Sequence, residues 1–155
     1  MVLRSFAAGL MLMVMSSCGG DTPAAPEGGQ GEITDIEVVA TDFAFQLSSD
    51  SIEAGEVRTT LINEGKQPHQ AGYYLLDEGV TYDDFMEEVL KDDSAIPRLS
   101  SSPLGHMRPL SGGERGVRPG DDVGAGTYAV LCSIRDPESG KNHYELGMAT
   151  LLEVR

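Results

Sequence analysis

Three side chains near the C-terminal end carry donor atoms of the kind that bind transition metals. Cys132, His143 and Met148 lie within the segment LCSIRDPESGKNHYELGM. Thiolate and thioether sulfurs are soft donors, and histidine is the commonest metal-binding side chain. The same residues also have an ordinary explanation, as a buried cysteine, a surface histidine and a methionine in the core. The rest of the sequence has to decide between these interpretations.

The N-terminal segment has the layout of an export signal. A basic residue, Arg4, precedes an apolar run over residues 6–15, which is shorter than a membrane-spanning helix needs. The following MSSCG, residues 15–19, resembles the lipobox of bacterial lipoproteins, in which small residues precede an obligatory cysteine. That resemblance implies a signal peptide over residues 1–17 and lipid attachment at Cys18. An ordinary cleaved signal with an incidental cysteine is the alternative.

Export raises the question of how the second cysteine, Cys132, is protected from oxidation. The chain has two cysteines, and if Cys18 carries lipid, Cys132 has no disulfide partner in the sequence. A free thiol outside the cytoplasm is open to oxidation. Either burial as a small hydrophobic residue or a metal–thiolate bond would protect it.

The charge balance is strongly acidic. The 155 residues include 25 acids and 11 Lys and Arg, which gives a formal net charge of −14. Such a surface repels nucleic acid and anionic lipid headgroups, so neither is expected as a partner. It suits a basic protein partner, or it serves only to keep the domain soluble, and both interpretations remain open.

The composition predicts one folded domain after a flexible linker. Residues 18–32 are rich in Gly, Pro and Ala and have no hydrophobic periodicity, which is typical of a linker. The domain is expected over residues 33–155, where short alternating or β-branched segments predict strands. These segments are ITDIEVVA, DFAFQL, EVRTTLIN, HQAGYYLL, GAGTYAVLC and GMATLLEV.

One helix is expected among the strands. In TYDDFMEEVLK, residues 81–91, apolar residues recur with helical spacing, and Thr81 can cap the first turn. The apolar seam expected to face the core consists of Tyr82, Phe85, Met86, Val89 and Leu90. Residues 92–124 are rich in Gly, Pro, Ser and Asp and are predicted to be mostly loop. Short strands separated by turns, with one short inserted helix, predict an all-β fold, a Greek-key β-sandwich.

The order of several residues resembles that of the cupredoxins, the small blue-copper β-sandwich proteins. The opening segments TDIEVVATDFAFQL and IEAGEV are also similar to the first strands of that family, so the resemblance covers about residues 33–155. The residues that carry it are Asn63, Gly65 and His69, then Gly126, Thr127 and Tyr128 leading into Cys132, and finally His143 and Met148.

The resemblance implies one type 1 copper site. In it His69 and His143 supply imidazole nitrogens, Cys132 a thiolate and Met148 a weak axial thioether. Such a set accommodates both Cu(I) and Cu(II), because thiolate favours the reduced ion and imidazole accepts either. The ligands then rearrange little when an electron is gained or lost.

One spacing departs from the family. Ten residues, SIRDPESGKN, lie between Cys132 and His143, where familiar blue-copper proteins have only a few. Pro137 and Gly140 allow a protruding, hairpin-like loop that returns His143 to the metal. The added cost of closing the longer loop is about 1 kcal/mol, which is small against metal-binding energies.

Each of the four residues also has an explanation without a metal. His69 could begin a strand with its ring in solvent, and Cys132 could be an inert core residue. His143 could lie at a loop tip, and Met148 could be ordinary packing. A second soft pair in GHM, residues 105–107, is expected to be a surface histidine beside a methionine that covers the sandwich edge, outside the site.

These inferences predict a membrane-tethered one-electron carrier on the outer face of the cytoplasmic membrane. It is expected to be a monomer, attached only through its lipid, that exchanges electrons with a redox protein, a basic one if the acidic surface serves docking. A copper-storing or copper-delivering protein and a metal-free cupredoxin-like binding module are the alternatives. An enzyme is not expected, since no phosphate-binding glycine loop, serine nucleophile elbow or CxxC motif occurs in the sequence.

Overall fold

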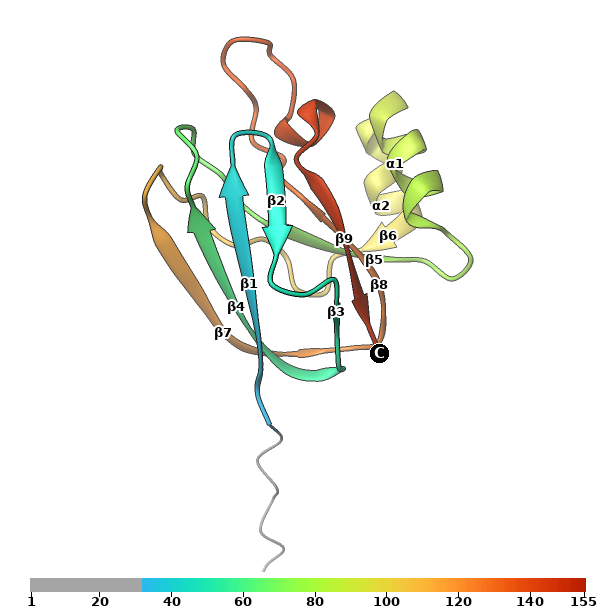
Figure 1. The fold of residues 1–155 in the computed structure, drawn as a ribbon. Helices are drawn as coiled ribbons and strands as arrows, with labels where there is room; N and C mark the ends of the chain where they lie inside the picture. Colours follow the sequence, from blue (N-terminus) through green and yellow to red (C-terminus); the bar gives the residue numbers. More distant parts are fainter. Residues whose placement is uncertain (1–31) are drawn as a thin grey trace, which may run out of the picture. The chain divides into compact units, whose positions relative to one another are not determined.

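Two β-sheets packed face to face make up the domain in a computed structural model, which describes residues 32–155 (Figure 1). The predicted all-β sandwich is therefore confirmed. The predicted signal peptide, the lipid-bearing Cys18 and nearly all of the predicted linker lie outside the described residues. No helix within residues 32–155 is both long and apolar enough to cross a bilayer.

The first sheet is mixed, with strand order β2-β1-β4-β7. Strand β1 pairs in parallel with β4, and the other two pairings are antiparallel. The strands are β1 (Thr34–Thr41), β2 (Ala44–Leu47), β4 (Gly55–Asn63) and β7 (Arg115–Val123).

The second sheet has strand order β3-β9-β8-β5-β6. Strand β3 pairs in parallel with β9, and the remaining pairings are antiparallel. The strands are β3 (Ser51–Ile52), β5 (Gly72–Leu76), β6 (Ser100–Ser101), β8 (Gly126–Leu131) and β9 (Ala149–Val154).

Strand β8 separates two buried layers because its side chains alternate between the two faces of the sheet. Tyr128 and Val130, with Cys132 just beyond the strand, belong to the core between the sheets. Ala129 and Leu131 belong to a second cluster on the opposite face of that sheet. The alternation thus carries Cys132 into the interior of the sandwich.

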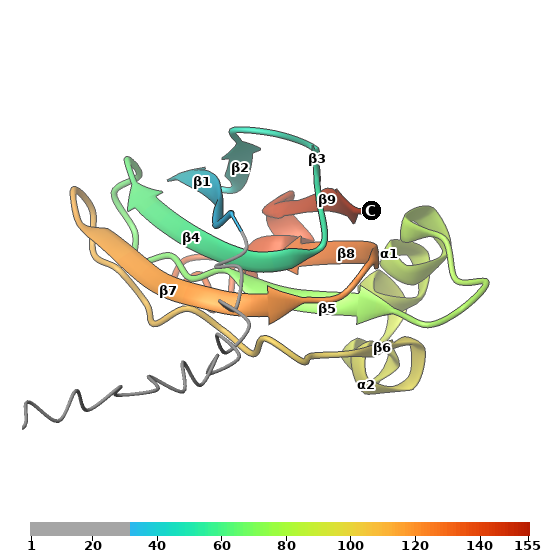
Figure 2. The same cartoon turned by 90° about the horizontal axis from the view of Figure 1, so that it is seen from below.

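The second cluster is covered by helix α1 (Tyr82–Lys91), which lies beside β5, β6 and β8 with the short helix α2 (Ile96–Leu99) (Figure 2). The Thr81 side chain accepts a hydrogen bond from the Asp84 backbone N–H, so the predicted cap is confirmed. Phe85 and Val89 are buried as predicted. Leu90 was expected in the same seam, but its side chain is 53% exposed.

The prediction that residues 92–124 are mostly loop is wrong. This segment contains the 3-10 helix η1 (Asp93–Ala95), α2, β6 and the nine-residue strand β7. Strand β7 has the sequence RGVRPGDDV, whose Pro, Gly and Asp residues disfavour strands. This composition is tolerated because β7 is an edge strand, paired only with β4. An edge strand has no second neighbour, so a proline without an N–H leaves no hydrogen bond missing on that side.

Candidate metal centre

The segments that carry the predicted metal ligands, between β4 and β5 and between β8 and β9, lie at one end of the sandwich, at the top of Figure 1. His69 lies between β4 and β5, and Cys132 follows β8 directly. His143 opens the 3-10 helix η2 (His143–Leu146), and Met148 precedes β9. Both sheets therefore contribute to positioning the four side chains.

The backbone of His69 is held by one bridge to Leu110. The His69 N–H donates to the Leu110 carbonyl at 3.0 Å, and the Leu110 N–H donates back at 2.8 Å. The Asn63 side chain also donates to the Leu110 carbonyl, at 2.8 Å. A strand beginning at His69 was expected, but β5 begins at Gly72, because its neighbour β8 ends at Leu131, the partner of Gly72.

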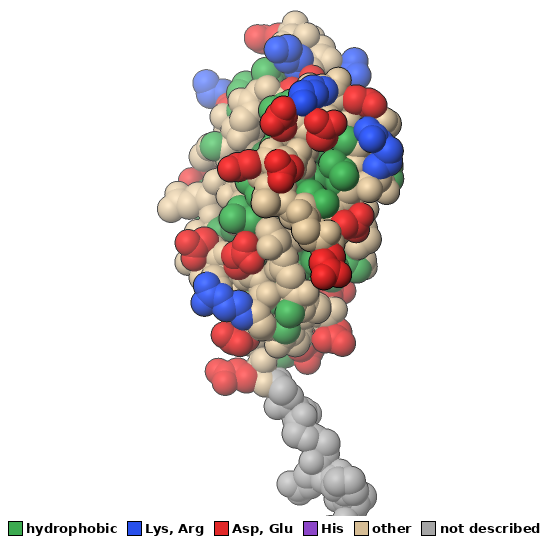
Figure 3. Space-filling model, turned by 90° about the vertical axis from the view of Figure 1, so that its right-hand side faces the viewer, with side chains coloured by type: hydrophobic (Ala, Val, Ile, Leu, Met, Phe, Trp, Pro, Cys, Tyr) green, Lys and Arg blue, Asp and Glu red, His purple; other side chains and the backbone are tan. Residues whose placement is uncertain are grey.

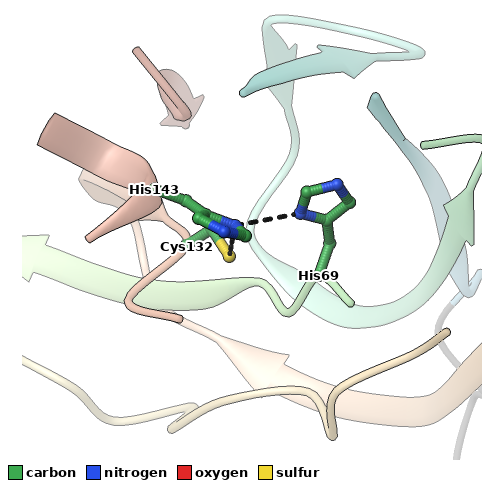
Figure 4. A group of neighbouring side chains, drawn as sticks. All are labelled: His69, Cys132 and His143. Atoms are coloured by element: carbon green, nitrogen blue, oxygen red, sulfur yellow. Dashed lines mark hydrogen bonds between the residues drawn. The ribbon is translucent and has the colours of Figure 1, made fainter. Parts of the chain in front are cut away.

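Three donor atoms converge in the interior (Figure 4). His143 Nδ1 lies 3.1 Å from His69 Nδ1 and 3.4 Å from Cys132 Sγ. A ligand atom from each of the three residues lies within 4.8 Å of the others. All three side chains are 0% exposed, so His143 is not at a loop tip and His69 does not have its ring in solvent.

The outer nitrogen of each imidazole is occupied by an acceptor. His69 Nε2 lies 3.2 Å from Asp42 Oδ1, and a carboxylate can only accept, so Nε2 donates. His143 Nε2 lies 3.1 Å from Gln67 Oε1. Both Nδ1 atoms are then left without a proton and face the Cys132 sulfur and each other. Without a metal, the Cys132 thiol can donate to the Nδ1 of His143, and a metal ion would bind both nitrogens.

The surroundings favour neutral imidazoles. Burial lowers the pKa of His69, although the Asp42 carboxylate acts in the opposite direction. Burial also lowers the pKa of His143, and the nearby His69 lowers it further against Asp136 and Asp42. Protons therefore compete weakly for the two Nδ1 atoms near neutral pH.

Burial also controls the thiol. It raises the pKa of Cys132, while the backbone N–H groups of Gln70 and Ile134, which donate to the sulfur, act in the opposite direction. In the absence of a cation the thiol is therefore favoured over the thiolate. A metal ion would bind the thiolate and displace the proton.

Backbone hydrogen bonds connect the three C-terminal positions. The Cys132 N–H donates to the Met148 carbonyl at 3.2 Å, and the Met148 N–H donates to the His143 carbonyl at 2.9 Å. The Tyr144 N–H donates to the Cys132 carbonyl at 2.9 Å. The Met148 side chain is fully buried and belongs to the same core cluster as Cys132.

The long segment between Cys132 and His143 forms a closed loop. Arg135 and Asn142 make an isolated bridge, and the Asp136 N–H donates to the Lys141 carbonyl at 2.7 Å. Gly140 turns the loop with φ +71°, a conformation that favours glycine. The hairpin-like shape expected from Pro137 and Gly140 is present, and it returns His143 to Cys132.

Four residues around the imidazoles were not anticipated from the sequence. The edge of the Phe43 ring packs against His143 at a centroid distance of 5.1 Å, and Phe43 adopts φ 66° in the β1–β2 turn. Asp42 and Gln67 accept from the imidazoles, and Asp136 accepts from Gln67 Nε2 at 2.9 Å. Their spacing in the sequence carries no signal of these contacts, because each depends on loops that only the fold brings together.

His106 and Met107 lie apart from this group. His106 Nε2 is 2.5 Å from the Tyr74 hydroxyl, and its ring crosses Gly72, where a Cβ would approach His106 Cδ2 to 2.4 Å. Met107 is buried in the core between the sheets. The pair therefore supplies no donor beside Cys132.

The donor set fits copper better than the common alternatives. A thiolate and two imidazoles, with a buried thioether nearby, match the preference of Cu(I) and Cu(II) for soft and imidazole donors. Structural zinc sites instead use four Cys or His ligands, and calcium and magnesium sites use oxygens. The residues present thus suit a type 1 copper ion held by His69, Cys132 and His143.

Comparison with solved structures identifies the fold. Dithionite-reduced auracyanin from the photosynthetic bacterium Roseiflexus castenholzii is 20% identical, with a TM-score of 0.51, over 79% of this chain and 97% of that chain. Rusticyanin from Thiobacillus ferrooxidans is 15% identical, with a TM-score of 0.51, over 81% of this chain and 79% of that chain. Both are cupredoxin β-sandwiches. The described domain has the cupredoxin fold.

No protein-family model and no curated protein matches the chain. The cupredoxin fold is thus established by architecture, at an identity too low to transfer an activity. What the cupredoxin domain can do has to be argued from its own side chains.

Proposed function

We propose that the protein is a one-electron carrier that holds a single copper ion through His69, Cys132, His143 and Met148. The observation that carries this proposal is the convergence of two Nδ1 atoms and one Sγ atom from fully buried side chains, with both Nε2 atoms already engaged. Copper, when bound, would supply the one-electron couple.

The side chains around the site suit rapid electron exchange. Hydrogen bonds from both imidazoles and burial of all three donors hold the ligands in place, so a change of charge requires little rearrangement. The Phe43 ring packs against His143 and helps to exclude water. Full burial also disfavours copper delivery, because a delivery site has to pass its ion to a partner's ligands.

The location belongs to the same proposal. Residues 1–17 would act as a signal peptide, and lipid on Cys18 would attach the domain through the linker to the outer face of the cytoplasmic membrane. The protein would act as a monomer and exchange electrons with a redox protein. A basic partner is favoured because carboxylates outnumber bases on the face that carries α1 (Figure 3).

Titration of the purified protein with Cu(II) tests the function. We expect an intense visible thiolate-to-copper band that saturates at one equivalent, absent from Cys132→Ser, together with reversible one-electron electrochemistry. Met148→Leu should keep the band and raise the reduction potential, because loss of a donor favours the lower charge. No band in the wild type, with Cys132 shown to be reduced by a thiol assay of the unfolded protein, would exclude the carrier and leave a metal-free binding module.

A further inference from the structure

Asp136 is buried beside the centre without belonging to the proposed ligands. Its side chain is 4% exposed and lies in the long loop between Cys132 and His143. One carboxylate oxygen accepts from Gln67 Nε2 at 2.9 Å, and the other accepts from the Ser139 backbone N–H at 2.7 Å. Both oxygens thus have fixed partners.

The carboxylate determines the orientation of the Gln67 amide. An ionised carboxylate only accepts hydrogen bonds, so the NH₂ end of the amide must face Asp136. The oxygen end then faces His143, with Oε1 at 3.1 Å from Nε2. With the amide turned the other way, its oxygen would face a carboxylate, and neither could donate.

The amide in turn determines the tautomer of His143. A neutral imidazole has one N–H, and the amide oxygen requires it on Nε2. The Nδ1 atom, which faces Cys132 and His69, is then left without a proton.

We propose that Asp136 and Gln67 are positioning residues that hold His143 in the Nε2–H tautomer, so that its Nδ1 is free to bind a metal. The metal-binding role of Nδ1 rests on the proposed function, whereas the tautomer follows from the hydrogen bonds of Gln67 alone. The long loop between Cys132 and His143 is then part of the positioning of His143, because it places Asp136 against Gln67. Both imidazoles are backed by a carboxylate, directly by Asp42 for His69 and through an amide for His143.

The variant Asp136→Asn should reverse the tautomer. The Ser139 N–H still needs an acceptor, so the oxygen of the introduced amide faces Ser139 and its NH₂ faces Gln67. Gln67 then turns its oxygen to that NH₂ and its own NH₂ to His143, whose Nε2 must accept. Long-range ¹⁵N–¹H correlation spectra of the metal-free protein, at about pH 8 to keep the imidazoles neutral, should change from Nε2–H to Nδ1–H.

Copper binding provides the second readout. The variant should bind copper about 10–100-fold more weakly, because Nδ1 has to lose a proton first. Asp136→Asn combined with Gln67→Glu should restore both the tautomer and the affinity, since a carboxylate at residue 67 accepts from both sides. Glu138→Gln is the matched control, with the same loss of charge at an exposed position in the same loop.

The outcomes separate the two proposals. A wild-type protein with Nδ1–H on His143, an unchanged tautomer in Asp136→Asn, or a double variant that folds without recovering Nε2–H would each overturn the positioning role. The expected tautomers in a wild-type protein that takes up no copper would support the positioning role and count only against the electron carrier.

Discussion

Gly65 lies against the His69 imidazole at a distance that only glycine permits. A Cβ at this position would lie 2.5 Å from Asp42 Oδ1 and 2.7 Å from His69 Nε2. We therefore expect Gly65→Ala to separate Asp42 from His69 and to weaken copper binding about 10–100-fold, the usual effect of losing a hydrogen bond to a ligand. Competition with a chelator of known affinity measures the change.

Gly124→Ala is the control for that substitution. A Cβ there meets nothing within 4 Å, and copper affinity should stay at the wild-type value. Equal affinities in both variants would show that the contact between Asp42 and His69 does not matter for the metal.

At the scale of single residues, the sequence indicates donors better than the groups that orient them. His69, Cys132, His143 and Met148 were selected by side-chain type and order, and the structure brings the first three together. Asp42 and Asp136 are two of the 25 acids in the chain, and no distinctive spacing marks out either of them or Gln67. Acceptor roles of this kind follow from the geometry of the loops and could not be predicted from the sequence.

At the scale of elements, α1 offers a direct test of packing. Phe85 is 0% exposed and packs in the cluster on the outer face of the second sheet, whereas Leu90 is 53% exposed. Phe85→Ala should lower the free energy of unfolding by about 3–5 kcal/mol, because it leaves a cavity. Leu90→Ala should change it by less than about 0.5 kcal/mol, since leucine and alanine are both good helix formers.

Denaturant unfolding of the metal-free protein measures both values. A similar loss in the two variants would mean that α1 packs through a different face. A negligible loss in Phe85→Ala would mean that the helix contributes little to the stability of the domain.

The elements that could be predicted were those with a clear periodicity. Strands β1, β4 and β9 and helix α1 have alternating or helical patterns that largely match their burial, and β8 is a short apolar run buried on both faces. Strand β7 was missed because it is mostly exposed and contains Pro119 and Gly120, so that its pairing with β4 is visible only in the fold. The parallel pairing of β1 with β4 is equally a tertiary feature.

At the scale of the whole molecule, Asp136 should affect stability in acid. Its hydrogen bonds hold the pKa of the carboxyl at about 2, below the ordinary 3.8, and those with Ser139 contribute more than the one with Gln67. Because the pKa is lower in the folded than in the unfolded state, the ionised carboxylate stabilises the protein when the pH is above the pKa of the unfolded state. This stabilisation is lost as the pH falls towards 2, the pKa of the folded state. The stability difference between wild type and Asp136→Asn should therefore be constant above about pH 5 and shrink as the pH falls below about 4.

Denaturant midpoints of the metal-free protein over this pH range provide the measurement. Glu138→Gln, which removes a carboxylate from an exposed position in the same loop, is measured beside Asp136→Asn as the control. A gap between wild type and Asp136→Asn that is undiminished at pH 2, where the carboxyl of the folded protein is about half protonated, would contradict the lowered pKa.

The two histidines of the centre are 74 residues apart in the chain, and each is placed by hydrogen bonds to other distant segments. Contacts of such high sequence separation form late, after the entropy of closing long loops has been overcome. We therefore expect the donors to meet only after the folding transition state. An ion that bridges the donors would therefore slow unfolding and leave the rate of folding almost unchanged.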